Sequence, residues 1–290
     1  MAVNRRNVIM GGLGIAGALG ATANYAAAIE PFDLKVTEYR LTPHSWPRQQ
    51  HLSIAVISDL HAGGPNMGLE RIRHVVETTN ALKPDLTVLL GDYIATHAFV
   101  TERVTHADWG SALAGLSAPL GVWAILGNHD WSQDVHIIRH TFMNADIPVL
   151  ENTAVHLNKK GQRFWLGGLG DQLAHSRTRS GFRGVDDLPG TLRRAQDSND
   201  PFILLAHEPD IFPKVPSRVA LTLCGHTHGA QIRVPFLWPY FVPSRFGARY
   251  AYGHIVEQDR HMVVSGGLGT SLIPARLGVP PEIVHIELGA

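Results

Sequence analysis

Five short apolar runs in the sequence are each followed by aspartate, asparagine or histidine side chains. Carboxylate oxygens and imidazole nitrogens suit manganese, iron or zinc rather than soft copper ions. A single histidine after a strand is usually an ordinary capped or solvated residue. Such side chains after all five apolar runs would be improbable by chance, so the pattern predicts a metal site. In chain order the segments are Asp59-Leu60-His61, Gly91-Asp92, Gly127-Asn128-His129-Asp130, His207 and Gly225-His226-Thr227-His228.

The apolar runs themselves have the length and composition of buried strands, because they are short and rich in leucine and β-branched residues. Ligands of α/β sheets bind at the carboxyl ends of the strands, so the polar segments that follow the runs should meet in space. The five runs lie at 52–58, 85–90, 121–126, 202–206 and 219–223.

The segments between these runs indicate the fold class. Helical spacing separates the early strands, as in parallel βαβ units, whereas the later half is richer in strands and includes a hairpin at Lys159-Lys160-Gly161. This order predicts an α/β fold in which two mixed β-sheets pack as a sandwich with helices outside. Helices are expected at 69–82, 102–116, 134–145 and near 187–197, and two further strands at 261–265 and 282–288.

The composition is that of a globular protein, with 290 residues, of which 44% are hydrophobic and 17% charged. The formal net charge is zero, so no specific nucleic-acid binding is evident from the sequence. Cys224 is the only cysteine, which excludes an intramolecular disulfide. Its position at the end of an apolar run predicts a small buried residue.

The N-terminus has the features of an export signal. Arg5 and Arg6 precede an uncharged stretch at 8–29, and two small-residue triplets near its end, at 21–23 and 26–28, offer cleavage after Ala23 or Ala28. This resembles a twin-arginine signal. An uncleaved membrane anchor is the alternative, although five glycines in the stretch disfavour a spanning helix. We therefore expect a signal or anchor at 1–28, a lead-in segment at 29–51 and a catalytic domain at 52–290.

The ordered blocks SDLHAG, LLGDY, LGNHDW, LLAHEPD and CGHTHGAQ resemble the signature blocks of calcineurin-like metallophosphoesterases. The resemblance runs from Leu52 to the C-terminus and is closest to the exported or membrane-associated bacterial branch. It implies a four-layer fold and two divalent or trivalent metal ions, with manganese favoured over iron or zinc. The implied ligands are Asp59, His61 and His228 for one ion, Asn128, His207 and His226 for the other, and Asp92 bridging both.

The same resemblance implies hydrolysis of a phosphoester by a metal-bound hydroxide. It places His129 beside the scissile phosphate, where an imidazole could protonate the leaving oxygen or stabilise charge. Asp130 is expected either to orient His129 or a neighbouring ligand, or to cap a helix. The family commonly has a second acid where this chain has Ala95, and Thr96 or His97 are candidates to compensate.

The sequence predicts an enzyme acting on phosphodiester or pyrophosphate bonds of a small-molecule or lipid substrate. Its expected location is the periplasm, the cell wall or the outer face of the cytoplasmic membrane. The aromatic, proline-broken stretch at 233–250 is expected to pack as an ordinary loop, with a wall for a lipid or aromatic leaving group as the alternative. Two rival functions are a membrane-anchored hydrolase of a lipid-linked precursor, such as UDP-diacylglucosamine or a phospholipid, and a non-catalytic metal-binding scaffold.

Overall fold

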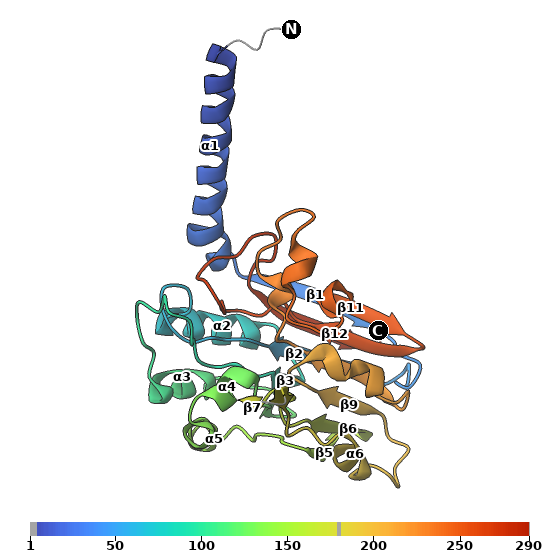
Figure 1. The fold of residues 1–290 in the computed structure, drawn as a ribbon. Coiled ribbons are helices and arrows are strands. Elements are labelled where there is room, and N and C mark those ends of the chain that lie inside the picture. The colour runs from blue at the N-terminus through green and yellow to red at the C-terminus, as the bar shows by residue number, and fades with distance from the viewer. Residues whose placement is uncertain (1–4, 179–180, 290) are drawn as a thin grey trace.

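Two mixed β-sheets lie face to face in the computed structural model, and helices cover their outer faces (Figure 1). The structure describes residues 5–178 and 181–289. This arrangement confirms the predicted α/β sandwich with four layers. Residues 1–4 of the expected signal segment lie outside the described residues.

The first sheet has five strands in the order β1-β13-β2-β3-β4. Only the pairing of β13 with β2 is antiparallel, so the chain's last strand lies between β1 and β2. The sequence predicted four of these strands but missed β1, which lies in the expected lead-in segment. β1 is an edge strand with mostly exposed side chains, so its hydrophobic signal is weak. The strands are β1 (Lys35–Leu41), β2 (Leu52–Ile57), β3 (Leu86–Leu89), β4 (Val122–Ala124) and β13 (Glu282–Leu288).

The second sheet has six strands in the order β11-β12-β10-β9-β6-β5, with the inner four parallel. The predicted hairpin is β5-β6, and Lys160 and Gly161 in its turn have φ angles of 51° and 91°, as a tight hairpin turn requires. The strands are β5 (Thr153–Lys159), β6 (Gln162–Gly168), β9 (Phe202–Leu205), β10 (Val219–Cys224), β11 (Gly253–Glu257) and β12 (Arg260–Val264), and β7 (His175–Thr178) and β8 (Gly181–Arg183) form a separate ribbon.

The hydrophobic core fills the space between the two sheets and continues under the helices. Leu52, Ile54 and Val88 of the first sheet pack with Ile203 and Leu221 of the second. Helices α2, α3 and α5 cover the first sheet, and α6 packs beside β5 and β6 of the second. All four helices fall within the predicted ranges, though α3 and α6 are shorter. The helices are α2 (Leu69–Ala81), α3 (His106–Leu113), α4 (Asn128–Ser132), α5 (Val135–Asn144) and α6 (Leu188–Arg193).

Helix α1 (Arg5–Ala28) projects away from the body of the protein (Figure 1). Its C-terminal end contacts the segment before β13, because the Ala26 carbonyl accepts a hydrogen bond from Arg276 N at 2.8 Å. The Glu30 carboxylate accepts another from Val279 N at 2.7 Å. Among the helices in the described ranges, none is long and apolar enough to cross a membrane.

Candidate metal centre

The loops after β2, β3, β9 and β10, together with α4, converge at one end of the two sheets. Asp59 and His61 follow β2, Asp92 follows β3, and His226 follows β10. The three loops that follow β2, β3 and β10 share an uncommon backbone conformation. The φ angle is positive at Asp59, His61, Asp92, His226 and His228. Positive φ costs a non-glycine residue roughly 1–3 kcal/mol, and such residues concentrate at functional sites.

The first group of candidate ligands consists of Asp59, His61 and His228, whose ligand atoms all lie within 4.8 Å of one another. His61 Nε2 is 3.1 Å from His228 Nε2, and His228 Nε2 is 3.4 Å from Asp59 Oδ1. Two imidazole nitrogens and a carboxylate oxygen therefore point at a common position. This is the first ligand group that the sequence predicted.

The second group consists of Asp92, His207 and His226, again within 4.8 Å. Asn128 joins it, because its Oδ1 lies 3.0 Å from His226 Nδ1. Asp92 faces both groups: its Oδ2 is 3.2 Å from His207 Nε2 and 3.7 Å from His61 Nε2. The structure thus brings together all seven predicted ligand positions, with Asp92 between the two groups.

The charge states of these side chains fit a cation site. Burial lowers the pKa of His61 to about 3 and also lowers the pKa values of His226 and His228, so these imidazoles are neutral. Burial opposes protonation of His207 as well, yet the Asp92 carboxylate raises its pKa well above the usual range. His207 Nε2 is buried and makes no hydrogen bond of proper geometry. Three neutral imidazoles and two carboxylates are donors that suit manganese, iron or zinc, and a metal ion at the second group would displace the proton of His207.

Two glycines allow the loops to approach this closely. A Cβ on Gly225 would lie 1.9 Å from Ser58 Oγ and 2.4 Å from Asp59 Oδ2. A Cβ on Gly127 would lie 2.4 Å from Asp92 Oδ1. Only glycine fits at either position, which explains why the predicted blocks place glycine directly before the ligands.

His129 lies at the edge of the two groups and lines an adjoining cavity. Its Nδ1 is 2.5 Å from Thr96 Oγ1, and its Nε2 is 3.4 Å from Ser271 Oγ. Its backbone N donates to Asp92 Oδ1 at 2.8 Å, which fixes the ring beside the predicted bridging carboxylate. Thr96 therefore holds the ring orientation of His129, whereas the His97 ring accepts a hydrogen bond from Phe99 N in its own exposed loop.

Asp130 does not contact the ring of His129. Its carboxylate accepts hydrogen bonds from the backbone N of Asp92 at 2.8 Å, of Tyr93 at 2.9 Å and of Gly127 at 2.9 Å. The last of these satisfies the backbone N of Gly127, the residue before α4. Asp130 thus positions the loops of neighbouring candidate ligands. It is not the helix N-cap that the sequence offered as the alternative, because it lies inside α4, and the N-caps of α4 and α5 are Gly127 and Asp134.

Two buried acidic residues that the sequence analysis did not single out, Asp171 and Glu208, lie next to His207. Burial and the neighbouring Glu208 raise the pKa of Asp171 to about 10, so this carboxyl is protonated at neutral pH. Asp171, His207 and Glu208 also lie within 4.8 Å of one another. Because Nδ1 of His207 bonds to the Leu90 carbonyl at 2.7 Å, only Nε2 is free to bind a metal, and Nε2 already faces Asp92. This third group is therefore not independent of the second.

Arg276 is the other residue that sequence reasoning missed. It is fully buried, and its guanidinium donates to the carbonyl oxygens of Gly266, Gly269 and Val279. Burial lowers its pKa to about 10, so it stays charged at neutral pH, and its charge acts on Asp59. An arginine in a loop with no local motif gives no sequence signal for such a role.

We expect Arg276→Ala to destabilise the protein by about 3–5 kcal/mol, because three buried carbonyls and the Asp59 charge lose their partner. At about 2–4 °C per kcal/mol, the melting temperature should fall by roughly 6–20 °C. Arg276→Lys keeps the charge and should lose less. Differential scanning calorimetry of the metal-free protein measures the shift. Equal melting temperatures for wild type and both variants would contradict this role.

Beside the two groups lies a cavity of about 1000 Å³. Asn128, His129, His226 and His228 line its inner end. Its outer wall is apolar and includes Leu237 and Phe241 from the stretch at 233–250. The expectation that this stretch packs as an ordinary loop is wrong for its tip, because Phe236 is 92% exposed and Tyr240 83% exposed.

The sequence between residues 52 and 230 matches the calcineurin-like phosphoesterase family. The chain belongs to that family. The matched region contains every strand end that carries a candidate ligand, so the family assignment and the geometry concern the same residues. The family and its named phosphodiesterase and pyrophosphatase relatives make this phosphoesterase a metal-dependent phosphoester hydrolase.

Relatives of this phosphoesterase include proteins of similar length. It is 33% identical over 297 residues to the uncharacterized metallophosphoesterase YkuE of Bacillus subtilis, covering 99% of this chain and 98% of that protein. It is 33% identical to the phosphodiesterase YaeI of Escherichia coli, covering 71% of each. It is 29% identical to the UDP-2,3-diacylglucosamine pyrophosphatase LpxG of Chlamydia trachomatis, covering 89% of this chain and 90% of that protein.

Among solved structures, the 5′-nucleotidase precursor from Thermus thermophilus superposes with a TM-score of 0.51 at 12% identity. The match covers 82% of this chain and 54% of that one, so this phosphoesterase spans about half of the nucleotidase. At this identity the likeness concerns the fold alone.

Proposed function

We propose that this phosphoesterase hydrolyses phosphodiester or pyrophosphate bonds at a dinuclear metal centre, with manganese favoured and iron or zinc as alternatives. The observation that carries the proposal is the position of Asp92 Oδ2, which faces both ligand groups within 3.7 Å. Asp59, His61 and His228 would hold one ion, Asn128, His207 and His226 would hold the other, and Asp92 would be shared between them.

When bound, two such ions polarise a nucleophilic water and neutralise the charge of the phosphoryl group. The protein's own residues then position the substrate. His129 Nε2 faces the cavity side, where it can donate a proton to the leaving oxygen while Thr96 holds Nδ1. The cavity provides room on the leaving-group side, which supports a substrate with a second ester substituent over a simple monoester.

We also propose that the protein acts outside the cytoplasm, in the periplasm, the cell wall or at the outer face of the cytoplasmic membrane. Support comes from the sequence, in which Arg5 and Arg6 precede an uncharged stretch ending in small residues, as in twin-arginine signals. Edman sequencing of the mature protein from cell fractions tests this, and an intact N-terminus in the cytoplasmic fraction would speak against it.

A membrane-anchored hydrolase of a lipid-linked precursor, such as UDP-diacylglucosamine or a phospholipid, is the second candidate. Two observations favour it: the apolar outer wall of the cavity, and the similarity to a relative named as a UDP-2,3-diacylglucosamine pyrophosphatase.

Metal add-back tests the proposed reaction. Metal-stripped protein should be inactive, and manganese, iron or zinc added singly should restore hydrolysis of a chromogenic phosphodiester more than of the matching monoester. Calorimetric titration should show two ions bound. Two bound ions without turnover of any diester or pyrophosphate would sink the proposal, whereas a strong preference for the monoester would correct its substrate class.

A further inference from the structure

The exposed apolar side chains of this protein are concentrated on one part of its surface. Of the seventeen large hydrophobic residues that are exposed among the described side chains, twelve come from three segments at 19–32, 234–246 and 272–273. We refer to these three segments as the apolar rim. Its twelve exposed members are Leu19, Tyr25, Ile29, Phe32, Val234, Phe236, Leu237, Tyr240, Phe241, Phe246, Leu272 and Ile273.

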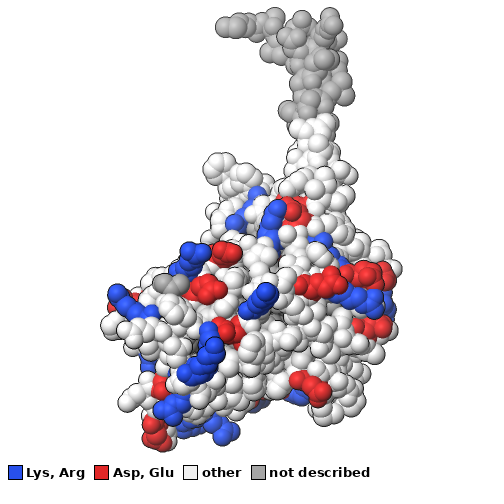
Figure 2. All heavy atoms as spheres, turned by 180° about the vertical axis from the view of Figure 1, so that it is seen from behind, with Lys and Arg blue, Asp and Glu red and all other residues white. Residues whose placement is uncertain are grey.

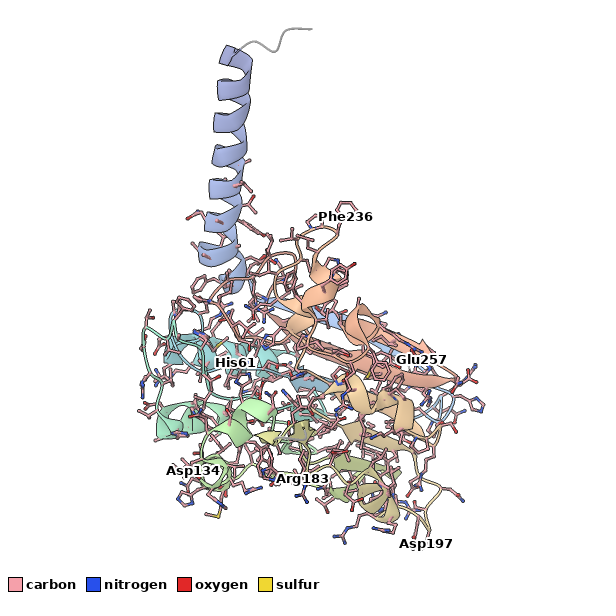
Figure 3. The ribbon with its side chains drawn as sticks, viewed as in Figure 1. His61, Asp134, Arg183, Asp197, Phe236 and Glu257 are labelled. Atoms are coloured by element: carbon pink, nitrogen blue, oxygen red, sulfur yellow. The ribbon has the colours of Figure 1, made fainter. Side chains whose placement is uncertain are left out.

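The three segments of the apolar rim are joined by hydrogen bonds. The Gln231 side chain donates to the carbonyls of Ile273 and Ala275 at 2.8 and 2.9 Å, and Arg233 N donates to Leu277 O at 2.7 Å. Arg276 N in turn donates to the Ala26 carbonyl at the end of α1. The loop that contains Phe236 therefore projects on the same side of the protein as α1 (Figure 3).

The tip of the rim is highly exposed. Phe236 is 92%, Tyr240 83%, Leu272 81% and Phe241 69% exposed. Soluble monomers rarely expose apolar side chains in a group of this kind unless the group binds something. The loop is also held in shape from beneath, because the Arg233 guanidinium lies 5.0 Å from the Trp238 ring and 4.9 Å from the Tyr252 ring.

The charge around the rim suits an anionic, amphiphilic surface. The sequence has no aspartate or glutamate between 231 and 256 or between 260 and 281, and Arg245 is exposed beside the loop. In the view from behind, the lobe that projects beside α1 is white, while charges of both signs cover the body (Figure 2). Aromatic side chains with nearby arginines are typical of segments that enter the interface of a bilayer.

The rim is continuous with the candidate active site. Leu237, Phe241 and Leu272 are exposed at the surface and also line the cavity whose inner end contains His129 and His226. A protein partner seated on the rim would cover the mouth of this cavity. A bilayer would instead place its own phosphoester headgroups at the mouth, so the geometry favours a membrane over a protein as the occupant.

We propose that the apolar rim docks the protein on a lipid bilayer and that the cavity admits a lipid phosphoester from it. The phosphoryl group would reach the two ligand groups while the lipid's apolar part lies along the wall formed by Leu237, Phe241 and Ile273. The docking surface stands on its own, whereas the substrate class rests on the proposed phosphodiester chemistry.

Vesicle flotation of the full-length protein tests the docking surface. Phe236→Ser combined with Tyr240→Ser should lower partitioning onto vesicles of phosphatidylcholine and phosphatidylglycerol by about tenfold or more. The matched control is Ile137→Ser combined with Met143→Ser, which removes two exposed apolar side chains from α5. It should partition like wild type. Equal losses in both double variants, or a loss in neither, would overturn the docking surface.

A fluorescent label separates the rim's contribution from that of the rest of the chain. Cys224 is fully buried, so Tyr240→Cys provides a single reactive thiol for an environment-sensitive fluorophore. Its emission should shift to shorter wavelength on vesicles and be quenched by spin-labelled lipid, whereas the same label at Met143→Cys should not respond. An unresponsive label at position 240 would contradict insertion of the rim.

Activity measurements separate docking from chemistry. With metal restored, the Phe236→Ser/Tyr240→Ser variant should hydrolyse a soluble chromogenic diester like wild type but lose about tenfold or more on phosphatidylglycerol in vesicles. Equal rates of both proteins on the vesicle lipid would overturn the role of the rim in delivering the lipid, and hydrolysis of the soluble diester without any hydrolysis of the vesicle lipid by wild type would overturn the lipid substrate class. If wild type docks but hydrolyses no diester at all, the proposed function fails while the docking surface stands.

Discussion

Asp92→Asn is expected to lower kcat/KM for a phosphodiester by about 10³-fold or more and to reduce the bound metal below two ions per chain. Asp92 Oδ2 faces both His207 Nε2, at 3.2 Å, and His61 Nε2, at 3.7 Å, so one change removes charge from both ligand groups. A two-metal site supplies several kcal/mol of transition-state stabilisation, and each 1.36 kcal/mol is a factor of ten. Steady-state kinetics and elemental analysis of the purified protein measure the two effects.

The asparagine variant should remain folded, which makes the result interpretable. Its side chain has the same shape and can still accept the hydrogen bond from His129 N. It removes a buried carboxylate that raises the pKa of Asp59, but it also leaves the buried His207 without its charged partner, so the metal-free variant should still unfold cooperatively with a lower melting temperature than metal-free wild type. Asp197→Asn, at an exposed position far from the site (Figure 3), is the matched control. Two bound ions and normal turnover in Asp92→Asn would show that this carboxylate does not bridge.

The candidate ligand positions could be predicted from the sequence because each is marked by a pattern of neighbouring residues. Each strand end combines an apolar run, a glycine or a short turn, and a polar residue within three positions, as at Gly91-Asp92 and Gly225-His226. The parallel pairing of β2 with β3 and of β9 with β10 then brings these ends to one side of the sheets.

The features that the sequence did not predict depend on contacts between distant parts of the chain. β13 pairs with both β1 and β2, which nothing in its own apolar pattern specifies. Arg276 is buried because the carbonyls of Gly266, Gly269 and Val279 surround it, and an isolated loop arginine is more often solvated. The exposed tip at Phe236 was missed for the opposite reason, since aromatic residues in a loop are expected to pack inward.

His129→Ala is expected to lower kcat by about 10²–10⁴-fold on substrates with a poor leaving group, and to leave two ions bound. His129 is not part of either ligand group, and its ring is held by Thr96 Oγ1 on one nitrogen while the other faces Ser271 and the cavity. Loss of a proton donor should slow departure of an alkoxide far more than departure of a nitrophenolate, which needs no proton. The measurement is kcat for an alkyl and a nitrophenyl diester with the same protein preparations.

Thr96→Val provides the positioning control for this prediction. It removes the partner of Nδ1 but keeps the imidazole, so it should show a smaller loss with the same dependence on the leaving group. If His129→Ala slows both diesters equally, the imidazole stabilises charge on the phosphoryl group rather than protonating the leaving oxygen. If His129→Ala loses a bound ion, its role lies in building the metal centre, and proton donation must then be assigned to another group lining the cavity.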